Sequence, residues 1–543
     1  KSFPVAGNRF AQVSSDNFSK IPGMPVAYWV SEKFADVFKN EKLYKYSISP
    51  SQNVTGNNDR FVRKFWELSN VKVGGRDEWI FYAKGGGFRK WWGNLLDIVN
   101  WTPTARYIYQ HGDGHHASQI INKDYWYRKG ITWGLITSSI PSFRVMPEGA
   151  TFDKGGSTII VEREVYNYAL GLLNSKVFLV VAKALNPTLN FQVKDICSLP
   201  LVISCLDVIN STVDKCIDIS QVDWDSFETS WDFKTHPLIK PVPLISESFA
   251  QWSDECEKRF TRLKSNEEEL NRIFIDIYSF QDELTPEVEE KDVTVRRADL
   301  TRDIKSLVSY AVGCMFWRYS LDVEGLAYAG GEWDGSKYKT FIPDPDNCIP
   351  VTDEEYFRDD IVVRFVDFIR TVYGADTLEE NLTFIADALG TRGNTSRERI
   401  RNYFLNDFIK DHIKMYQKRP IYWMFDSGKQ NGFRALVYMH RWNADTTGNV
   451  RVEYLHKLQR IYENEIRQSQ DVAETGSGRE VSAAQKRIEK LTKQLKETHD
   501  FDEKIAHLAL SRIDIDLDDG VKVNYEKVQT GDDGKKIEVL TKI

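Results

Sequence analysis

The sequence predicts an α+β protein, a mixed α/β region followed by a mainly α-helical C-terminal region with a helical hairpin and a terminal β-hairpin. Strand-length runs rich in β-branched and aromatic residues, punctuated by Gly and Pro, occupy the chain to about residue 205. Helical periodicity dominates from about residue 247. The same division appears in the charge. Residues 1–205 are basic, with 25 Lys+Arg and 16 Asp+Glu, and residues 206–543 are acidic, with 47 Lys+Arg and 63 Asp+Glu.

The first domain is predicted over residues 1–205. The runs WIFYAKGG and STIIVEREV are typical of strands, and IPGMP, KGGG, MPEG and DKGG supply turn residues. VEREVYNYALGLLNSKVFLVVAKAL is typical of a strand end followed by a helix. Residues 206–246 are predicted to be a polar connector, which ends in the cluster Pro237, Pro241 and Pro243.

A helical domain is predicted over residues 247–449. Its first helix carries apolar side chains near a 3.6-residue period, at Phe249, Trp252, Cys256, Phe260, Leu263, Leu270, Ile273 and Ile277. In residues 450–543, two long amphipathic segments separated by TGSG predict an antiparallel helical hairpin arm. VKVNYEKV and KKIEVLTKI, joined by QTGDDG, then predict a closing β-hairpin.

Composition restricts the class of protein. The chain has no run of 18 apolar residues, which argues against a membrane span, and its first ten residues, KSFPVAGNRF, do not resemble a signal peptide. Without an initiator Met the sequence is expected to be a fragment, a domain or a processed product. Six scattered cysteines with no C-x-x-C pair predict reduced thiols and a cytoplasmic location.

An autonomous active site is not visible in the sequence. Walker, G-x-G-x-x-G, H-E-x-x-H, G-x-S-x-G and EF-hand motifs are all absent. YQHGDGHHAS places His111, His115 and His116 beside Asp113, and this group is either a turn-rich polar loop, the favoured interpretation, or a metal site. No catalytic residue and no metal ligand is therefore predicted.

Three clusters in the basic half predict a DNA-binding surface. They are TGNNDRFVRKFWE, KGGGFRKWWGN and WYRKGITWG, which combine cations with glycines and aromatic rings. Cations neutralise phosphates, glycines allow close backbone approach, and Asn94 offers an amide to a base edge. The predicted DNA-binding residues are Thr55, Asn57, Asn58, Arg60, Arg63, Lys64, Lys84, Arg89, Lys90, Asn94, Arg128 and Lys129.

For the second cluster a purely structural interpretation stays open. Phe88, Trp91 and Trp92 are then core aromatics, and the glycines of this segment only shape a hairpin. The two interpretations predict different effects of mutation. A loop that faces DNA needs Arg89 and Lys90 for binding, whereas a buried hairpin needs its tryptophans for folding.

Several motifs together resemble the PglX (BrxX) family, the adenine-specific DNA methyltransferases of BREX phage-defence systems. The resemblance spans roughly residues 1–470. It is carried by KIPGMPVAYWVSE, TGNNDRFVRKFWE, KGGGFRKWWGN, SFRVMPEGATFDKGG, LGLLNSKVF, NPTLNFQVKDICSLP, SYAVGCMFWRYSLDVEGLAYAGG and KRPIYWMFDSGKQNGFRALVYMHRW, in this order. SFRVMPEGATFD and NFQVKDI-x-x-LP also resemble target-recognition domains of type I and type IIG enzymes.

The resemblance implies a target-recognition domain plus a C-terminal region. The family's [N/D]-P-P-[Y/F] motif and Gly-rich cofactor loop are both absent from this sequence. S-adenosyl-L-methionine binding and methyl transfer are therefore expected of a catalytic domain outside it, and the chain alone is expected to be inactive. Double-stranded DNA and other BREX subunits are the implied partners, with a phage DNA-mimic protein as a further possibility.

Two other functions stay open at this stage. The acidic helical part, with its hairpin arm, suits a scaffold that docks defence-system subunits, while the basic half binds an acidic protein. The other is an intact nuclease or methyltransferase whose site is not recognised in the sequence.

Overall fold

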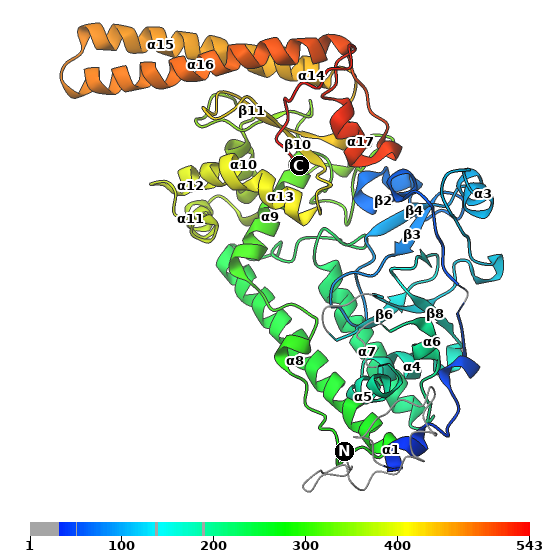
Figure 1. Cartoon of the computed structure of the whole chain (residues 1–543). Coiled ribbons are helices and arrows are strands. Elements are labelled where there is room, and N and C mark those ends of the chain that lie inside the picture. Colours follow the sequence, from blue (N-terminus) through cyan, green and yellow to red (C-terminus); the bar gives the residue numbers. More distant parts are fainter. Residues whose placement is uncertain (1–31, 50, 136–139, 187–190) are drawn as a thin grey trace, which may run out of the picture. The chain divides into compact units, whose positions relative to one another are not determined.

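The computed structural model describes residues 32–49, 51–135, 140–186 and 191–543 (Figure 1). The motif KIPGMPVAYWVSE therefore lies almost wholly outside the described residues, and so does part of NPTLNFQ. The chain divides into two compact units that interleave along the sequence. Unit 1 comprises residues up to Val62, Val73–Trp231 and Ser253–Ala298, and unit 2 comprises Arg63–Lys72, Asp232–Trp252 and Asp299–Ile543.

Unit 1 contains two small sheets. The first has the order β1-β8-β5-β6, in which Ile131 of β5 lies opposite Val145 on one side and Ile159 on the other. In the second sheet β3 pairs with β4 antiparallel and with β7 parallel. The strand order is β2-β4-β3-β7, and the chain leaves unit 1 within β2. The strands are β1 (Ser47–Ile48), β2 (Val62–Lys64), β3 (Trp79–Ala83), β4 (Asp97–Asn100), β5 (Gly130–Trp133), β6 (Phe143–Met146), β7 (Thr151–Phe152) and β8 (Thr158–Val161).

Helices cover the sheet formed by β1, β8, β5 and β6. Its strands are buried along their whole length at β5, β6 and β8, and the polar residues in them, Thr132, Arg144 and Thr158, are buried as well. Trp133, Phe143 and Ile159 join one core with Leu170, Phe178, Val213 and Phe274 from the helices. The helices of unit 1 are α1 (Glu32–Val37), α2 (Asn58–Phe61), α3 (Pro103–His111), α4 (Tyr166–Leu173), α5 (Lys176–Leu185), α6 (Val193–Cys197) and α7 (Leu206–Asp225).

The stretch predicted as a connector begins with the 20-residue helix α7. Ile209, Val213, Cys216 and Ser220 are buried at helical spacing, and they supply the apolar face that holds α7 against the core of unit 1. The predicted face of the next helix is confirmed. α8 (Ile245–Tyr278) begins in the residues of unit 2 and ends in those of unit 1, with its apolar positions buried or partly buried.

Unit 2 is mainly helical, with one three-stranded sheet. The motif KRPIYWMFDSGKQNGFRALVYMHRW forms the hairpin β10 (Tyr422–Asp426) and β11 (Arg434–Tyr438), and β9 (Ile349–Pro350) adds to β11. Around it lie α9 (Leu300–Met315), α10 (Ile361–Tyr373), α11 (Leu378–Leu389), α12 (Ser396–Tyr403), α13 (Ile409–Met415) and α14 (Thr446–Asn449). The predicted fold class, mixed α/β with a helical C-terminal region, is confirmed.

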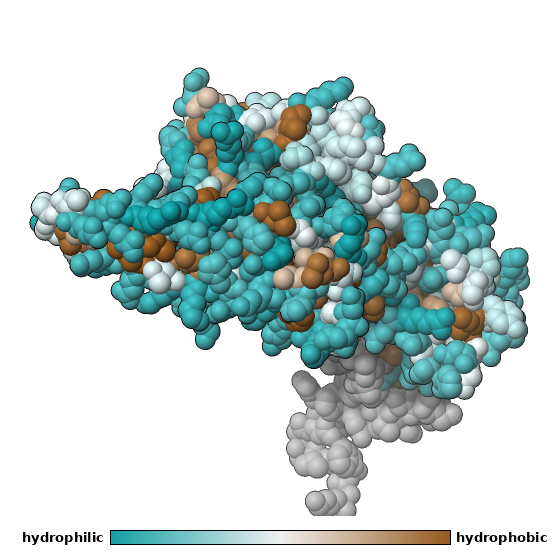
Figure 2. Space-filling view, turned by 90° about the horizontal axis from the view of Figure 1, so that it is seen from above, coloured by the Kyte–Doolittle hydropathy of each residue, from teal (hydrophilic) through white to brown (hydrophobic). Residues whose placement is uncertain are grey.

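The predicted helical hairpin is confirmed as α15 (His456–Thr475) and α16 (Arg479–Ser511), which run antiparallel in Figure 1. Leu458 and Leu491 are fully buried. Figure 2 shows a largely hydrophilic surface on this arm, interrupted by hydrophobic residues. Among the described residues, no single helix has the length and apolarity needed to cross a bilayer; α4 and α5 reach that threshold only as a pair bent by 84°.

The predicted terminal β-hairpin is wrong. VKVNYEKV forms α17 (Gly520–Lys527), not a strand. Val521, Asn524 and Tyr525 are buried, whereas Val523 is exposed, so burial follows a helical period and not the alternation of a strand. The second predicted strand makes only isolated bridges, Thr530 with Lys536 and Leu540 with Phe425.

Candidate nucleic-acid interface

The first predicted cluster, TGNNDRFVRKFWE, is built around the N-terminus of α2. The Asn57 side chain caps this helix by accepting a 3.0 Å hydrogen bond from the backbone N–H of Arg60, and the buried Thr55 hydroxyl donates to the side-chain Oδ1 of Asn58 at 2.7 Å. Arg60 is exposed and lies over the Phe61 ring at 4.8 Å. These polar residues therefore shape the turn that presents Arg60.

The same cluster continues into unit 2, where the Arg63 side chain and the Lys64 backbone have protein partners. The Arg63 Nε donates to the Asp518 carbonyl at 3.2 Å. The backbone N–H of Lys64 donates to the Glu67 carboxylate at 2.8 Å. Arg60 therefore belongs to one unit, while Arg63 and Lys64 belong to the other.

The second cluster, KGGGFRKWWGN, is a buried structural segment at its centre. Arg89 is only 5% exposed and pairs with Asp223 at 2.7 Å; it also donates to the carbonyls of Ser220 and Thr294. Lys90 is 7% exposed and pairs with Glu267 at 2.7 Å. Burial by itself raises the pKa of Asp223, but Arg296 and Arg89 outweigh it and hold that pKa below its ordinary value.

These contacts correct the expectation that Arg89 and Lys90 face phosphate. Both cations are neutralised by carboxylates inside unit 1. If either side chain turned outward to a phosphate, a buried carboxylate would lose that partner. Trp91 is fully buried and donates its indole N–H to Glu267 at 2.7 Å, as the structural interpretation requires. Asn94 has a φ of +60° and its amide donates to the Gly87 carbonyl at 2.8 Å, which closes the loop on itself.

The glycines of this segment serve close packing against the DKGG loop. Gly85 has a φ of +88°, and a Cβ on Gly156 would lie 2.2 Å from the Ala83 carbonyl oxygen. Lys84 pairs with Asp153 at 2.9 Å across the two loops. The buried Arg144 donates to the Gly85 carbonyl, and burial, together with nearby Arg89, lowers the pKa of Arg144 to about 10.

This glycine loop does not fit S-adenosyl-L-methionine. A dinucleotide-type cradle needs open space above the glycines and a helix N-terminus to receive the ligand. Here a Cβ on Gly86 would meet the Asn94 side chain at 2.8 Å, and a Cβ on Gly85 would meet the Gly155 carbonyl at 2.9 Å. Protein atoms fill the space above Gly85 and Gly86, and only Gly87 is open, so we assign no residue of this segment to the cofactor.

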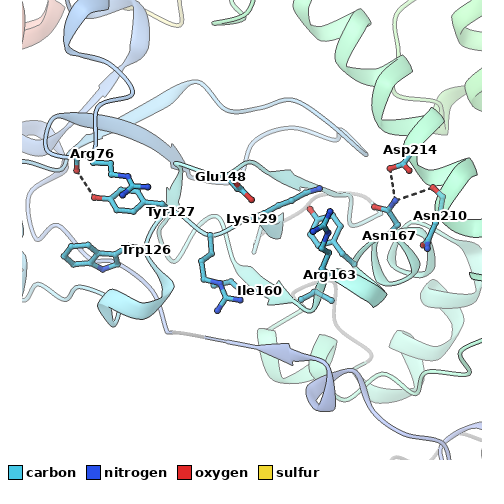
Figure 3. A pocket seen from close by; sticks show the side chains of 13 residues that line it. Arg76, Trp126, Tyr127, Lys129, Glu148, Ile160, Arg163, Asn167, Asn210 and Asp214 are labelled. Atoms are coloured by element: carbon cyan, nitrogen blue, oxygen red, sulfur yellow. Dashed lines mark hydrogen bonds between the residues drawn. The ribbon is translucent and has the colours of Figure 1, made fainter.

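The third cluster, WYRKGITWG, lines a pocket of about 1050 Å³ in unit 1 (Figure 3). The pocket is lined by Arg76, Trp126, Tyr127, Arg128, Lys129, Glu148, Ile160, Val161, Arg163, Tyr166, Asn167, Asn210 and Asp214. These residues come from β8, α4 and α7, from the turn that begins at Arg163, and from the loops before β3, before β5 and after β6, all within unit 1. The pocket brings Arg128 and Lys129, which were predicted to bind DNA, together with side chains that were not predicted to do so.

Four cations line this pocket and are exposed: Arg76, Arg128, Lys129 and Arg163. None of them forms a recorded ion pair with a carboxylate in the part of the chain that the structure describes. The ammonium nitrogen of the exposed Lys129 lies 4.2 Å from the centre of the Tyr166 ring, a cation–π contact that holds this charge at the pocket. The pocket therefore has a positive wall of four cations against two lining carboxylates, Glu148 and Asp214, unlike the neutralised KGGGFRKWWGN segment.

Aromatic and polar groups flank the cations. Tyr127, held at a φ of +62°, donates its hydroxyl to the Arg76 carbonyl at 2.7 Å, and the Arg76 guanidinium lies 5.6 Å from the Tyr127 ring. Figure 3 shows Trp126 and Tyr127 at one end of the pocket and Asn167, Asn210 and Asp214 at the other. Cations beside aromatic rings and amides are the side chains that contact phosphates and base edges.

The histidine-rich loop is a capped turn. The Asp113 carboxylate accepts hydrogen bonds from the backbone N–H groups of His115 and His116 at 2.9 and 2.8 Å, and it also contacts the His116 ring. These hydrogen bonds, the backbone ones first, lower the pKa of Asp113. Among the described residues, no group of three or more His, Cys, Asp or Glu side chains is arranged to hold a metal ion.

Two known proteins are similar to this chain, and both belong to one class of enzyme. The relatives of this chain are adenine-specific methyltransferases, and no family model matches it. The chain is 43% identical to the adenine-specific methyltransferase PglX of Lacticaseibacillus casei (strain Zhang) over 553 residues, and 35% identical to the adenine-specific methyltransferase BrxX of Escherichia coli O9:H4 (strain HS) over 559 residues.

Each alignment covers 96% of this chain and 46% of the relative. The chain is thus a homologue of PglX and BrxX along almost its whole length, and the resemblance predicted from the motifs is confirmed. It spans about half the length of the curated relatives it matches.

Proposed function

We propose that this chain is the DNA target-recognition part of an adenine-specific DNA methyltransferase of a BREX phage-defence system, and that unit 1 contacts the double-stranded DNA. The observation that carries the proposal is the positive wall of the pocket. Arg76, Arg128, Lys129 and Arg163 are exposed without carboxylate partners among the described residues, whereas the buried cations Arg89 and Lys90 are neutralised.

The relatives supply the class of reaction. Both are named adenine-specific methyltransferases, so a DNA substrate and S-adenosyl-L-methionine as methyl donor belong to the enzyme that we propose. We assign no residue of this chain to methyl transfer. Its role is to position the duplex through phosphate contacts, on which base reading depends. The exposed Arg60, on the capped turn before β2, is the further candidate for a phosphate contact.

The test is duplex binding by the full chain with Arg128→Ala and Lys129→Ala combined. Each lost phosphate contact removes counterion release, so affinity falls and the slope of log K against log salt becomes shallower by about one unit per contact. Binding is measured by fluorescence anisotropy at two or more salt concentrations. Lys183→Ala with Lys194→Ala is the matched control, because both lysines are exposed in unit 1 and lie outside the pocket.

Equal slopes for the pocket variant and the wild-type chain would remove the pocket from the DNA interface. The combined variant Arg89→Ala, Lys90→Ala is not a substitute test. Its cations are buried in ion pairs, so any loss of binding follows a loss of folding.

A further inference from the structure

The end of the pocket formed by Asn167, Asn210 and Asp214 differs from the cationic wall because its side chains are fixed by one another. The Asn167 amide nitrogen donates to the Asp214 carboxylate at 2.7 Å and to the Asn210 carbonyl at 3.3 Å. Figure 3 shows Asn167 between these two residues, with both contacts drawn. Asn167 lies in the first turn of α4, and the other two lie on α7, so two packed helices hold the arrangement.

These contacts determine which way the Asn167 amide faces. Both neighbours of its nitrogen are hydrogen-bond acceptors, so a carbonyl oxygen in the same place would face two oxygens. The amide nitrogen therefore occupies that side, and both of its N–H bonds are used. Asn167 keeps only its Oδ1 for a ligand, and this oxygen is an acceptor.

A second acceptor in the same place lacks a donor. Asn210 lines the pocket, and its Oδ1 is buried without a hydrogen-bond partner in the described structure. A buried acceptor without a donor is costly, and such groups in folded proteins normally have a protein, water or ligand partner. Asn167 therefore presents an acceptor whose own amide donors are already used, which suits a ligand that brings an N–H group.

We infer that Asn167 is a specificity-determining residue, held by Asp214, that accepts a hydrogen bond from the exocyclic amino group of a cytosine; this inference rests on the proposed function. On the major-groove edge cytosine presents only its N4 amino donor, whereas adenine places an acceptor, N7, beside its N6 donor. An asparagine that reads adenine uses its N–H and its oxygen together. Asn167 has no N–H left for N7, so its Oδ1 matches the single donor of cytosine and leaves N7 of adenine without a donor, which favours cytosine.

The experiment is selection of binding sites by the full chain from a pool of random duplex DNA. It is run with the wild-type chain, Asn167→Ala, Asp214→Ala and Asn40→Ala. Asn40 is an exposed asparagine of unit 1 outside the pocket and serves as the control. The wild-type chain is expected to enrich a site in which one position is cytosine. Replacing that base by 2-pyrimidinone, which lacks the amino group, is expected to weaken binding by about 5- to 150-fold.

Each variant gives a different expected result. Asn167→Ala loses the preference at that single position, and it binds the cytosine and 2-pyrimidinone duplexes equally. Asp214→Ala frees the Asn167 amide to rotate, so adenine becomes accepted at the same position. Asn40→Ala keeps the wild-type site. The salt dependence of binding is expected to be the same in all four proteins, because no phosphate contact is removed.

The two proposals fail separately. A wild-type site that Asn167→Ala reproduces unchanged, or an affected position that is adenine in the wild-type site, would overturn the assignment of Asn167. So would salt-sensitive binding with no enriched sequence, which would keep the duplex contact of unit 1 but remove the reading of a target sequence. Binding to duplex DNA that does not respond to salt would remove the proposed function itself, and the inference with it.

Discussion

At the scale of single residues, two kinds of cation lie close together in the sequence of unit 1 and differ in role. Arg89 bonds Asp223 and two backbone carbonyls from inside the unit, whereas Arg128 is exposed at the pocket. We expect Arg89→Ala to lower the free energy of unfolding by about 3–5 kcal/mol, because it leaves a buried carboxylate with one fewer partner. Urea denaturation followed by tryptophan fluorescence measures the change.

Arg128→Ala is the matched control for this prediction. Its side chain is exposed, so the free energy of unfolding is expected to change by less than about 0.5 kcal/mol. An Arg89→Ala protein that is as stable as the wild-type chain, yet binds DNA less tightly, would contradict the structural role and restore this cation to the DNA interface.

Glycine acts at the same scale between the KGGG and DKGG loops. A methyl group at Gly156 would approach the Ala83 carbonyl oxygen to 2.2 Å, and a backbone atom cannot move aside as a flexible side chain can. We expect Gly156→Ala to destabilise unit 1 by about 1–3 kcal/mol, the usual cost of overpacking. Thermal unfolding tests it against Gly87→Ala, where φ is not positive and no atom lies within 4 Å of the added Cβ; an equal loss in the two variants would contradict the role of close packing at Gly156.

The sequence shows where the cations and glycines lie along the chain, but not which of them are buried and which are exposed. Arg89 and Arg128 both stand beside a lysine and near aromatic residues, so local sequence does not separate them. Their difference comes from Asp223 and Glu267, which reach the KGGG segment from distant helices. A buried partner of this kind has no local signature in the sequence.

At the scale of elements, long periodic segments were predictable and short ambiguous ones were not. α15 and α16 hold an apolar period over many turns, and the hairpin follows from it. VKVNYEKV is only eight residues long, and its Val521, Val523 and Tyr525 fit a strand by alternation. The structure buries Asn524 and exposes Val523, and the contacts that decide this come from elsewhere in unit 2.

The hairpin arm gives a prediction about packing between two elements. Leu458 is fully buried in α15, and Leu458→Ala is expected to cost about 2–5 kcal/mol of stability through lost burial and a residual cavity. Val472, on the same helix, is 43% exposed, and Val472→Ala is expected to be nearly neutral. Limited proteolysis near Thr475–Gly478 and chemical denaturation measure both. Equal effects of the two substitutions would show that the arm does not pack as described.

At the scale of the whole molecule, the charge asymmetry between the two ends of the chain was readable from the sequence, but the pocket was not. Arg128 and Lys129 were predicted, because they sit beside aromatic residues in one short segment. Arg76, Arg163, Asn167 and Asp214 join them from separate segments, and each segment taken alone is an ordinary polar stretch. Only the packing of α4 and α7 beside the first sheet of unit 1 brings these side chains together.

Buried histidines predict how stability of the whole chain depends on pH. His236, His412 and His440, all in unit 2, are buried, and burial lowers the pKa of each to about 3. In the unfolded chain a histidine has a pKa of about 6.5. The unfolded state therefore binds more protons as pH falls below about 6.5, so stability is lost progressively between about pH 6.5 and pH 3.

The effect can be isolated with one histidine. His440 contacts the Leu68 carbonyl through Nε2 at 3.0 Å, and a glutamine amide can donate to the same oxygen without titrating. Because Asp344, whose pKa burial and Asp346 raise to about 8, responds to pH in the opposite sense, the wild-type curve alone does not report the histidines. Between pH 7 and pH 5, His440→Gln is expected to lose about 2 kcal/mol less than the wild-type chain. His115→Gln, at an exposed position, is expected to follow the wild-type curve, and parallel curves for all three proteins would show that His440 titrates normally in the folded state.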